Sequence, residues 1–271
     1  GQEKMINLVK QKVKTLQKTD HCIDFCDVKG QETAKRGLEI AAAGGHNVLL
    51  KGPPGTGKTM LARAFASILP PLTNQESLEV TSIASVSGTL PNSHGLIRER
   101  PFRSPHHSSS AVSLVGGGAW PKPGEVSLAH RGVLFLDELP EFSRHVLEHL
   151  RGPLEDGEVS ISRAAATVLF PARFILVSSM NPCPCGFATD PKKHCVCSTK
   201  CLSRYQKKLS GPLLDRFDLI IEVPNLDSKK LLYEKPSEGS KDIRDRVVLA
   251  RKTQKARFKN EALITNAEIP T

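Results

Sequence analysis

The sequence predicts an α/β fold in which one parallel sheet lies between two layers of helices. The first observation is a set of short, almost continuous apolar runs, which are typical of strands buried on both faces. The second is that these runs alternate with segments of helical periodicity. The predicted strands cover residues 47–51, 133–136, 174–177 and 219–223. We therefore expect a three-layer αβα core with its ligand site at the carboxyl ends of the strands.

Helical periodicity predicts the elements around these strands. Apolar side chains at Met5, Val9, Val13 and Leu16 predict a lead-in helix over residues 2–19. Further helices are expected over residues 33–43, 60–69 and 143–155. The first of them should end at the glycine pair of residues 44–45.

Two further segments complete the predicted organisation. Residues 157–170 alternate polar and apolar side chains on either side of an alanine run, which predicts an inserted β-hairpin. Residues 227–262 have a helical pattern that is interrupted by Pro-Ser-Glu-Gly at 236–239. The expected units are a lead-in helix and linker over 1–27, an α/β core over 28–225 and a partial helical lid over 226–271.

The charge balance bears on possible partners. The 271 residues carry 38 Lys and Arg against 28 Asp and Glu, a net charge of +10. This excess favours contact with a polyanion such as nucleic acid, although a solubilising surface gives the same count. The sequence has neither an apolar run of about 18 residues nor an N-terminal secretory pattern, so we expect a cytoplasmic protein with no membrane partner.

A glycine-rich loop follows the first predicted strand. Residues 52–59 match G-x-x-x-x-G-K-[ST] between a strand and a helix, the context in which this motif binds phosphates. Backbone N–H groups would surround the phosphates, Lys58 would contact the β and γ phosphates, and Thr59 would ligate Mg²⁺. The alternative is a structural turn that opens a helix. The residues expected to bind ATP are Gly52, Pro53, Pro54, Gly55, Thr56, Gly57, Lys58, Thr59 and Met60.

An acidic pair ends the second predicted strand. Asp137 is placed to reach Mg²⁺, and Glu138 is placed to orient the water that attacks ATP. The alternative is that both residues only cap the next helix. Asn181 ends a neighbouring strand and could hold the same water, although Asn-Pro pairs are also common in ordinary turns.

Arg216 precedes the last predicted strand within Leu-Leu-Asp-Arg-Phe-Asp. A guanidinium at this place could stabilise transition-state charge on the ATP of a neighbouring subunit. The alternative is a pair with Asp215 or Asp218 of the same chain. Together with Lys58, Asp137, Glu138 and Asn181, Arg216 completes the expected catalytic set.

Cysteines crowd into the loop of residues 182–201, which holds five of the seven in the chain. Without a secretory pattern, such crowding favours metal binding or free thiols over structural disulfides. Two C-x-C pairs could supply four thiolates to a structural zinc ion. This spacing is less specific than C-x-x-C, so Cys201 or His194 could replace a ligand, and reduced thiols or a redox pair are the alternatives. The predicted ligands are Cys183, Cys185, Cys195 and Cys197.

These motifs occur in the order found in AAA+ ATPases. Further stretches resemble the magnesium-chelatase-like YifB/ComM family of AAA+ ATPases, and the resemblance covers about residues 24–225. The matching stretches are GHN at 45–47, FRSPHH at 102–107, LVGGG at 114–118, PGEVSLAH at 123–130, NPCPCG at 181–186 and SGPLLDR at 210–216.

The resemblance implies an AAA+ core of the pre-sensor-1 hairpin group, with ATP held between the subunits of a homo-hexameric ring. It would make Asn181 sensor 1, place Arg216 at the neighbour's ATP, and give zinc to the cysteine loop. The hairpin of residues 157–170 would face the central pore. The implied activity is ATP-driven translocation and branch migration on single-stranded or branched DNA.

Two other functions remain open on the sequence alone. One is a magnesium-chelatase-type motor subunit, which shares the core but remodels a partner protein. The other is a scaffold that binds ATP without hydrolysing it, for which the water-orienting acid Glu138 would be superfluous.

Overall fold

The computed structural model describes residues 23–90, 95–118, 120–162, 167–190, 192–226, 237–259 and 265–269. The predicted lead-in helix over 2–19 lies outside these residues. The described part of the linker contains a 3-10 helix, η1 (Phe25–Asp27), which is capped by the Asp24 side chain. Phe25 is fully buried in the hydrophobic core. The division of the chain into lead-in, core and lid stays a prediction.

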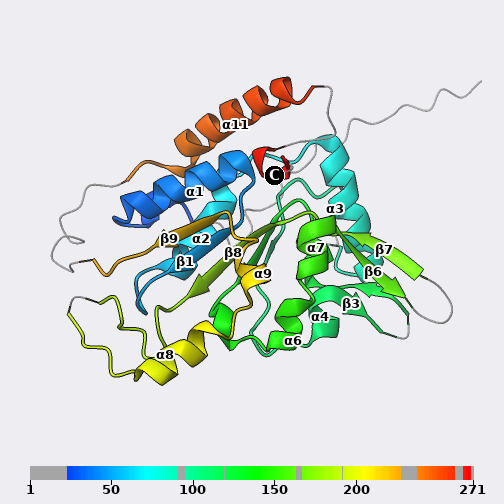
Figure 1. Ribbon diagram of the computed structural model, residues 1–271. Helices are drawn as coiled ribbons and strands as arrows, with labels where there is room; N and C mark the ends of the chain where they lie inside the picture. Colours follow the sequence, from blue (N-terminus) through cyan, green and yellow to red (C-terminus); the bar gives the residue numbers. More distant parts are fainter. Residues whose placement is uncertain are drawn as a thin grey trace, which may run out of the picture.

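Parallel strands form a central five-stranded sheet in the order β2-β5-β8-β1-β9 (Figure 1). The strands predicted from apolar runs are confirmed as β1 (Val48–Lys51), β5 (Val133–Leu136), β8 (Ile175–Met180) and β9 (Leu219–Glu222). The sequence did not predict β2 (Phe102–Arg103), because two residues are too few to show a periodicity.

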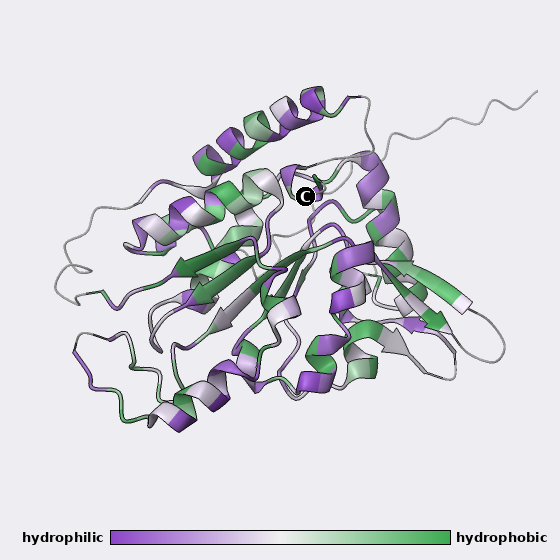
Figure 2. Ribbon diagram, viewed as in Figure 1, coloured by the Kyte–Doolittle hydropathy of each residue, from purple (hydrophilic) through white to green (hydrophobic). Residues whose placement is uncertain are grey.

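Alternate residues of each central strand face two separate hydrophobic cores. In β1, Val48 and Leu50 belong to one core, whereas Leu49 belongs to the other, and all three are at most 2% exposed. The apolar residues of β5 and β8 are divided between the two cores in the same way. This double burial explains why the strands are almost wholly apolar, as the green arrows of Figure 2 show.

Three longer helices cover one face of the sheet: α1 (Glu32–Gly44), α2 (Lys58–Ile68) and α11 (Ser240–Arg257) (Figure 1). The first two confirm the helices predicted over 33–43 and 60–69. As predicted, α1 ends at the glycine pair: its last residue is Gly44, and its C-cap Gly45 has a left-handed backbone with φ +78. α11 confirms the helical pattern that follows the Pro-Ser-Glu-Gly break, and it buries Ile243 and Val247 in the core shared with α1 and α2.

Shorter helices cover the opposite face. They are α4 (Ala111–Val115), α5 (Glu125–Leu128), α6 (Arg144–Glu148), α7 (Arg151–Asp156), α8 (Thr199–Gln206) and α9 (Gly211–Leu214), with the 3-10 turn η2 (Leu139–Glu141). The helix predicted over 143–155 is divided into α6 and α7. Pro153 explains the division, because it has no N–H to donate to the carbonyl of His149 and its ring would clash there in a continuous helix.

Two antiparallel hairpins lie on the same side of the molecule (Figure 1). β6 (Glu158–Ser162) and β7 (Thr167–Pro171) confirm the hairpin predicted over 157–170. The second hairpin, β3 (Gly116–Gly117) with β4 (Lys122–Pro123), was not predicted. The hairpins pack against each other, since a Cβ added at Gly116 would lie 2.9 Å from Cδ1 of Ile161.

The remaining described helices are α3 (Asn74–Ser87) and η3 (Asn266–Glu268). Thr73 and Glu76 form a capping box at the start of α3, with each side chain accepting a backbone N–H of the other. Among the helices that the structure describes, none combines the length and the apolarity that a bilayer-spanning helix needs.

Candidate nucleotide site and cysteine cluster

Three neighbouring strands end side by side and carry most of the predicted site residues. β5, β8 and β1 are adjacent in the sheet, and they are followed by Asp137, Asn181 and Gly52. The loop after β1 is tied to the next strand, because the N–H of Gly52 donates to the carbonyl of Met180 at 3.2 Å. Residues far apart in the sequence therefore meet at the carboxyl edge of the sheet, where parallel α/β proteins bind their ligands.

The glycine-rich loop is shaped by a close backbone approach and by left-handed residues. A Cβ at Gly52 would lie 2.1 Å from the carbonyl oxygen of Val223, so only glycine fits there. Gly57 caps α2 with φ +89, a conformation that glycine adopts without strain. This cap makes no side-chain hydrogen bond to the first turn of α2. The N–H groups of that turn are therefore available to an anion.

The remaining loop residues divide into buried and exposed ones. Thr56 is buried, and its Oγ1 donates to the carbonyl of Pro53 at 3.0 Å. Pro54 and Gly55 are exposed, and Gly55 has φ +78. Met60 is 41% exposed on the first turn of α2. The loop thus has a fixed base and an open rim.

Lys58 lies folded over the base of the loop. Its Nζ donates to the carbonyls of Gly52 and Pro53 at 2.8 and 2.7 Å, and to Oδ1 of Asn181 at 3.1 Å. Burial lowers the pKa of Lys58, whereas the two carboxylates at the end of β5 oppose that shift. The structure thus brings together the loop lysine and the residue expected as sensor 1.

Thr59 and Asp137 are also in direct contact. Oγ1 of Thr59 donates to Oδ2 of Asp137 at 2.8 Å. The other carboxylate oxygen of Asp137 accepts from the hydroxyl of Ser179, and that hydroxyl accepts from the N–H of Glu138 at 3.2 Å. A hydroxyl and a carboxylate held together supply the hard oxygen ligands that Mg²⁺ prefers.

Glu138 does not act as a helix cap through its side chain. It is the N-cap of η2, but its side chain makes no capping hydrogen bond and is exposed. Its backbone is left-handed with φ +52, which is uncommon for a residue other than glycine. The structure therefore does not support the interpretation in which Glu138 only caps the next helix.

Arg216 lies away from the other predicted residues. Its carbonyl accepts from Nδ2 of Asn47 at 2.9 Å, which places Arg216 at the amino end of β1. The loop at Gly52 is about 16 Å further along that strand, at roughly 3.3 Å per residue. The guanidinium pairs with Glu155 of α7. The sequence alone allows Asp215 or Asp218 as the ion-pair partner of Arg216 within the same chain, but the partner in the structure is Glu155.

Thiols gather in the loop after β8. The Sγ atoms of the cysteines at 183, 185, 195 and 197 all lie within 4.8 Å of one another. The separation is 3.3 Å between Cys183 and Cys185, 3.7 Å between Cys183 and Cys195, and 3.6 Å between Cys185 and Cys195. Tetrahedral zinc with Zn–S bonds of about 2.3 Å needs S···S separations of about 3.8 Å. The donor set therefore fits zinc, and among the described residues it includes neither Cys201 nor His194.

The cysteine loop lies directly against the nucleotide edge. Gly186 has φ +85, and a Cβ there would lie 2.6 Å from Cδ of Pro54 in the glycine-rich loop. The Tyr205 hydroxyl of α8 donates to the carbonyl of Asn181 at 3.3 Å, and burial raises the pKa of this phenol to about 12. The cysteine loop and α8 therefore contact both the glycine-rich loop and Asn181.

Sequence reasoning missed two residues that organise this edge. Gln31 is buried at the start of α1 with φ +58, and its side-chain amide donates to the carbonyls of Pro224 and Thr56 at 2.8 and 3.3 Å. It links α1, the end of β9 and the glycine-rich loop. Ser179 is the second. The polar Ser178-Ser179 pair inside a mostly apolar strand was the available signal.

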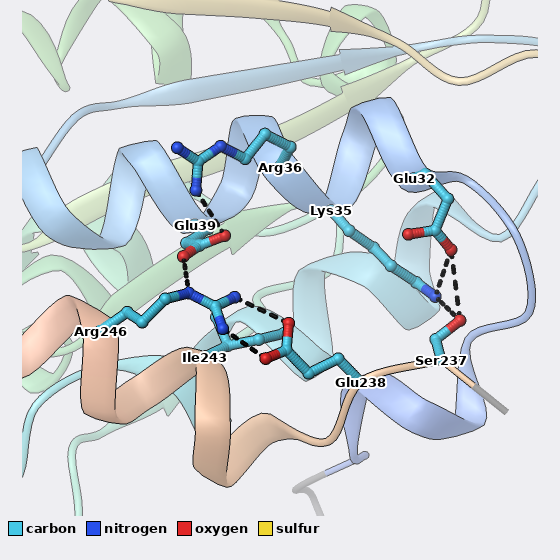
Figure 3. A pocket seen from close by; sticks show the side chains of 8 residues that line it. All are labelled: Glu32, Lys35, Arg36, Glu39, Ser237, Glu238, Ile243 and Arg246. Carbon is cyan, nitrogen blue, oxygen red and sulfur yellow. Dashed lines mark hydrogen bonds and ion pairs between the residues drawn. The ribbon is translucent and has the colours of Figure 1, made fainter.

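A polar cleft between α1 and α11 is a separate feature (Figure 3). Arg246 of α11 donates to Glu39 of α1 at 2.6 Å and also forms a bidentate pair with Glu238. Lys35 donates to the hydroxyl of Ser237 at 2.5 Å. These contacts join α11 to α1, and none of the residues predicted to bind nucleotide lines the cleft.

A glycine-rich loop lies between a central parallel strand and a helix, and an acidic residue directly follows β5, which is separated from that strand by β8. This is the arrangement of a P-loop nucleotide-binding protein. The family model described as magnesium chelatase, subunit ChlI, matches residues 24–231. The chain therefore belongs to this family, and the resemblance inferred from its motifs is confirmed.

Individual relatives show which proteins of the family the chain is similar to. YifB of Escherichia coli is 51% identical over 251 residues, which cover 91% of this chain and 48% of YifB. The competence protein ComM of Haemophilus influenzae is 51% identical over 249 residues, with coverages of 91% and 48%. A magnesium-chelatase 38 kDa subunit of Cereibacter sphaeroides is 28% identical over 221 residues, with coverages of 73% and 58%. The chain thus spans about half the length of the curated relatives it matches.

A solved structure supports the fold. It is a complex between subunits BchI and BchD of magnesium chelatase, based on a cryo-EM reconstruction. The match has a TM-score of 0.53 and 25% identity, and covers 92% of this chain and 80% of that chain. The predicted three-layer α/β fold is confirmed.

Proposed function

We propose that this chain binds ATP with Mg²⁺ and hydrolyses it at the edge formed by β5, β8 and β1. The observation that carries the proposal is the meeting of side chains from the loop and two strand ends, with Lys58 on Asn181 at 3.1 Å and Thr59 on Asp137 at 2.8 Å. Phosphoryl transfer needs positioning and charge neutralisation of this kind more than covalent chemistry.

Each residue at the edge has a role in this proposal. Lys58 and the N–H groups of the glycine-rich loop hold the phosphates. Thr59 and Asp137 hold Mg²⁺, which neutralises phosphate charge and orients the γ-phosphate. Glu138 orients the attacking water through its exposed carboxylate, and Asn181 positions that water as sensor 1. This proposal excludes a scaffold that binds ATP without turnover.

Arg216 is proposed to act on the ATP of a neighbouring subunit in a hexameric ring. Its position at the amino end of β1 places it too far from the glycine-rich loop of its own chain to contact the same nucleotide. The pair with Glu155 holds the guanidinium at the surface, where it is 40% exposed. A trans-acting arginine commonly contributes about 10³-fold or more to turnover.

The test of this role compares Arg216→Ala with the unmodified chain at rising protein concentration. We expect ATP binding to be kept while turnover falls by about 10³-fold in the assembled form. Arg204→Ala on α8 is the control, since it removes another exposed arginine. A monomer that hydrolyses ATP as fast as the assembly would contradict the trans role.

Zinc is proposed as a structural ion on Cys183, Cys185, Cys195 and Cys197. The spacing of their thiols supports it: the pairs among Cys183, Cys185 and Cys195 are 3.3 to 3.7 Å apart, and all four Sγ atoms lie within 4.8 Å of one another. With four protein ligands a zinc ion has no open position for water, so the metal would organise the loop and not activate a nucleophile.

DNA translocation and branch migration are proposed as the work driven by ATP. The net charge of +10 and the similarity to a competence protein support a DNA partner. The rival is a magnesium-chelatase-type motor, which the family description and the 28% identical chelatase subunit favour. The hairpin β6–β7 is the proposed DNA-facing element.

The deciding experiment measures ATP turnover with and without single-stranded, duplex and branched DNA at a stated salt concentration. Stimulation by single-stranded or branched DNA, weakened by added salt, is expected for a translocase. Unchanged turnover together with no binding of labelled DNA would remove this proposal and favour a protein substrate. The Glu138→Gln variant should bind the same DNA without turnover, which separates binding from chemistry.

A further inference from the structure

Trp120 is the single tryptophan of the chain, and its side chain is 83% exposed. It lies in the turn between β3 and β4. An aromatic side chain of this kind buries about 150–250 Å² when it packs into a core, so leaving it in water forgoes a large stabilisation. An exposed large aromatic residue at the turn of a hairpin is therefore a candidate for contact with a partner.

The hairpin that carries Trp120 has a tightly packed base. A Cβ at Gly116 would lie 2.4 Å from the carbonyl oxygen of Lys122, and one at Gly124 would lie 2.3 Å from the N–H nitrogen of Gly116. Pro123 is buried. Because these approaches leave no room for side chains, the base is fixed and only the turn projects.

The acidic residues of the helices that contact this hairpin are paired with arginines. The helices α3 and α5 contact β4, and their carboxylates belong to Glu76, Glu79 and Glu125. Each is paired with an arginine: Glu76 with Arg100 at 3.4 Å, Glu79 with Arg131 at 2.8 Å, and Glu125 with Arg103 at 2.6 Å. Lys122 is exposed next to the turn. The charge around Trp120 therefore favours an anionic partner.

The neighbouring hairpin points to the same partner. β3 packs on β6 through the close approach of Gly116 and Ile161, and the two hairpins lie side by side in Figure 1. β6–β7 is the element proposed above to face DNA. A flat aromatic ring beside a lysine is the combination with which proteins bind single strands, since every base offers a face for stacking and every linkage a phosphate.

We propose that Trp120 stacks on a base of single-stranded DNA and that Lys122 contacts the adjoining phosphate. This inference rests on the proposed function, because it names the residues through which the second hairpin holds the strand. Stacking of this kind tolerates any base, so the contact adds affinity for the strand without sequence preference.

The single tryptophan makes the test direct. In the first measurement, the tryptophan fluorescence of the unmodified chain is followed during titration with oligothymidylate. In the second, the anisotropy of labelled oligothymidylate measures binding by Trp120→Ala, Trp120→Phe and Lys122→Gln. We expect quenching on binding, roughly tenfold weaker binding for Trp120→Ala and near-normal binding for Trp120→Phe. Lys122→Gln should reduce the salt dependence of binding by about one phosphate contact. Ile220→Ala, which removes an exposed apolar side chain from β9, should change nothing.

Each outcome decides the proposal. DNA binding with unchanged fluorescence, or equal affinity for Trp120→Ala and the unmodified chain, overturns the stacking role and leaves the proposed function standing. An altered assembly state of Trp120→Ala in light scattering, with DNA affinity retained, would assign the tryptophan to a subunit interface instead. Absence of any DNA binding by the unmodified chain removes both proposals. ATP turnover without DNA should be equal in all variants, which confirms that they fold.

Discussion

The nucleotide edge and the cysteine loop lie against each other, yet different forces hold them in shape. The nucleotide edge is built on strands whose apolar side chains are at most 2% exposed in β1 and β5, and its loop is tied to β8 through the hydrogen bond between Gly52 and Met180. The described part of residues 182–198 contains neither a helix nor a strand, and Val196 within it is 85% exposed. Burial fixes the first region, whereas the second lacks a core of its own.

The difference shows where a metal would matter. A loop with few buried apolar side chains gains little from the hydrophobic effect, and a bound ion can replace a core by joining distant ligands. The regions are joined by the close approach of Gly186 to Pro54 and by the chain itself, since Cys183 follows Asn181 by two residues. A substitution in the cysteine loop should therefore lower ATP affinity only modestly. A substitution at the nucleotide edge should have little effect on zinc binding by the cysteine loop.

The largest effect on ATP binding is expected from Lys58→Ala. The substitution removes the ammonium group that lies on the loop carbonyls and Asn181, and with it the contact proposed for the β and γ phosphates. ATP binding should weaken by roughly a hundredfold or more, because charge-assisted hydrogen bonds are the strong ones. Titration with a fluorescent ATP analogue measures it. Near-normal affinity would show that Lys58 serves the fold only, and Lys51→Ala serves as the control.

Glu138→Gln should separate binding from chemistry within the nucleotide edge. The amide cannot orient water as a base, so turnover should fall by about 10² to 10⁴-fold while ATP affinity stays within a few-fold. Phosphate release and nucleotide titration on the same preparation give both values. Normal hydrolysis by this variant would remove the assignment of Glu138. The exposed Glu141→Gln, in the following turn, should leave turnover unchanged.

Serine substitution of the four clustered cysteines should loosen the cysteine loop without removing the nucleotide edge. We expect one zinc per chain of the unmodified protein by mass spectrometry. Each variant should lose that zinc, because a structural zinc ion needs all four protein ligands. Hydrogen exchange should rise in residues 182–198, while ATP affinity should fall by less than about tenfold. Cys201→Ser is the matched control, since Cys201 lies on α8 outside the thiol group.

Two results would overturn this ligand assignment. One is substoichiometric zinc in protein purified without chelator. The other is an equal loss of zinc from Cys201→Ser and from the four clustered positions. Loss of all ATP binding on chelation would instead contradict the separate stability of the nucleotide edge.

Gly186→Ala should give the smallest effect, and it probes the contact between the two regions. The added methyl group has to occupy a position 2.6 Å from Cδ of Pro54, on a backbone with φ +85. A left-handed alanine costs about 1 kcal/mol, and a shift of Pro54 should weaken ATP binding by roughly threefold. Zinc content should be unchanged. Gly152→Ala in α7 is the control, because a Cβ there meets no atom within 4 Å. Equal ATP affinities would show that the contact transmits nothing.

The sequence by itself determined the strands and the residues at their ends. Four apolar runs became β1, β5, β8 and β9, because strands that pack into the hydrophobic cores are apolar along most of their length. The phosphate-binding loop of residues 52–59 could also be predicted from the sequence, since phosphate binding fixes both the residue types and their spacing. The four thiols were predicted as one group from two C-x-C pairs. These features depend on residues that are close together in the chain.

Only the tertiary structure decided which distant residues meet. The pair of Arg216 with Glu155 could not be predicted, because their 40% exposed side chains leave no periodic pattern. Gln31 reaches the carbonyls of Thr56 and Pro224 across the fold, and nothing local marks it. The hairpin β3–β4 escaped prediction because its strands have two residues each. Burial leaves a periodic signal in the sequence, whereas a single polar contact between remote elements leaves none, so such contacts appear only once the chain has folded.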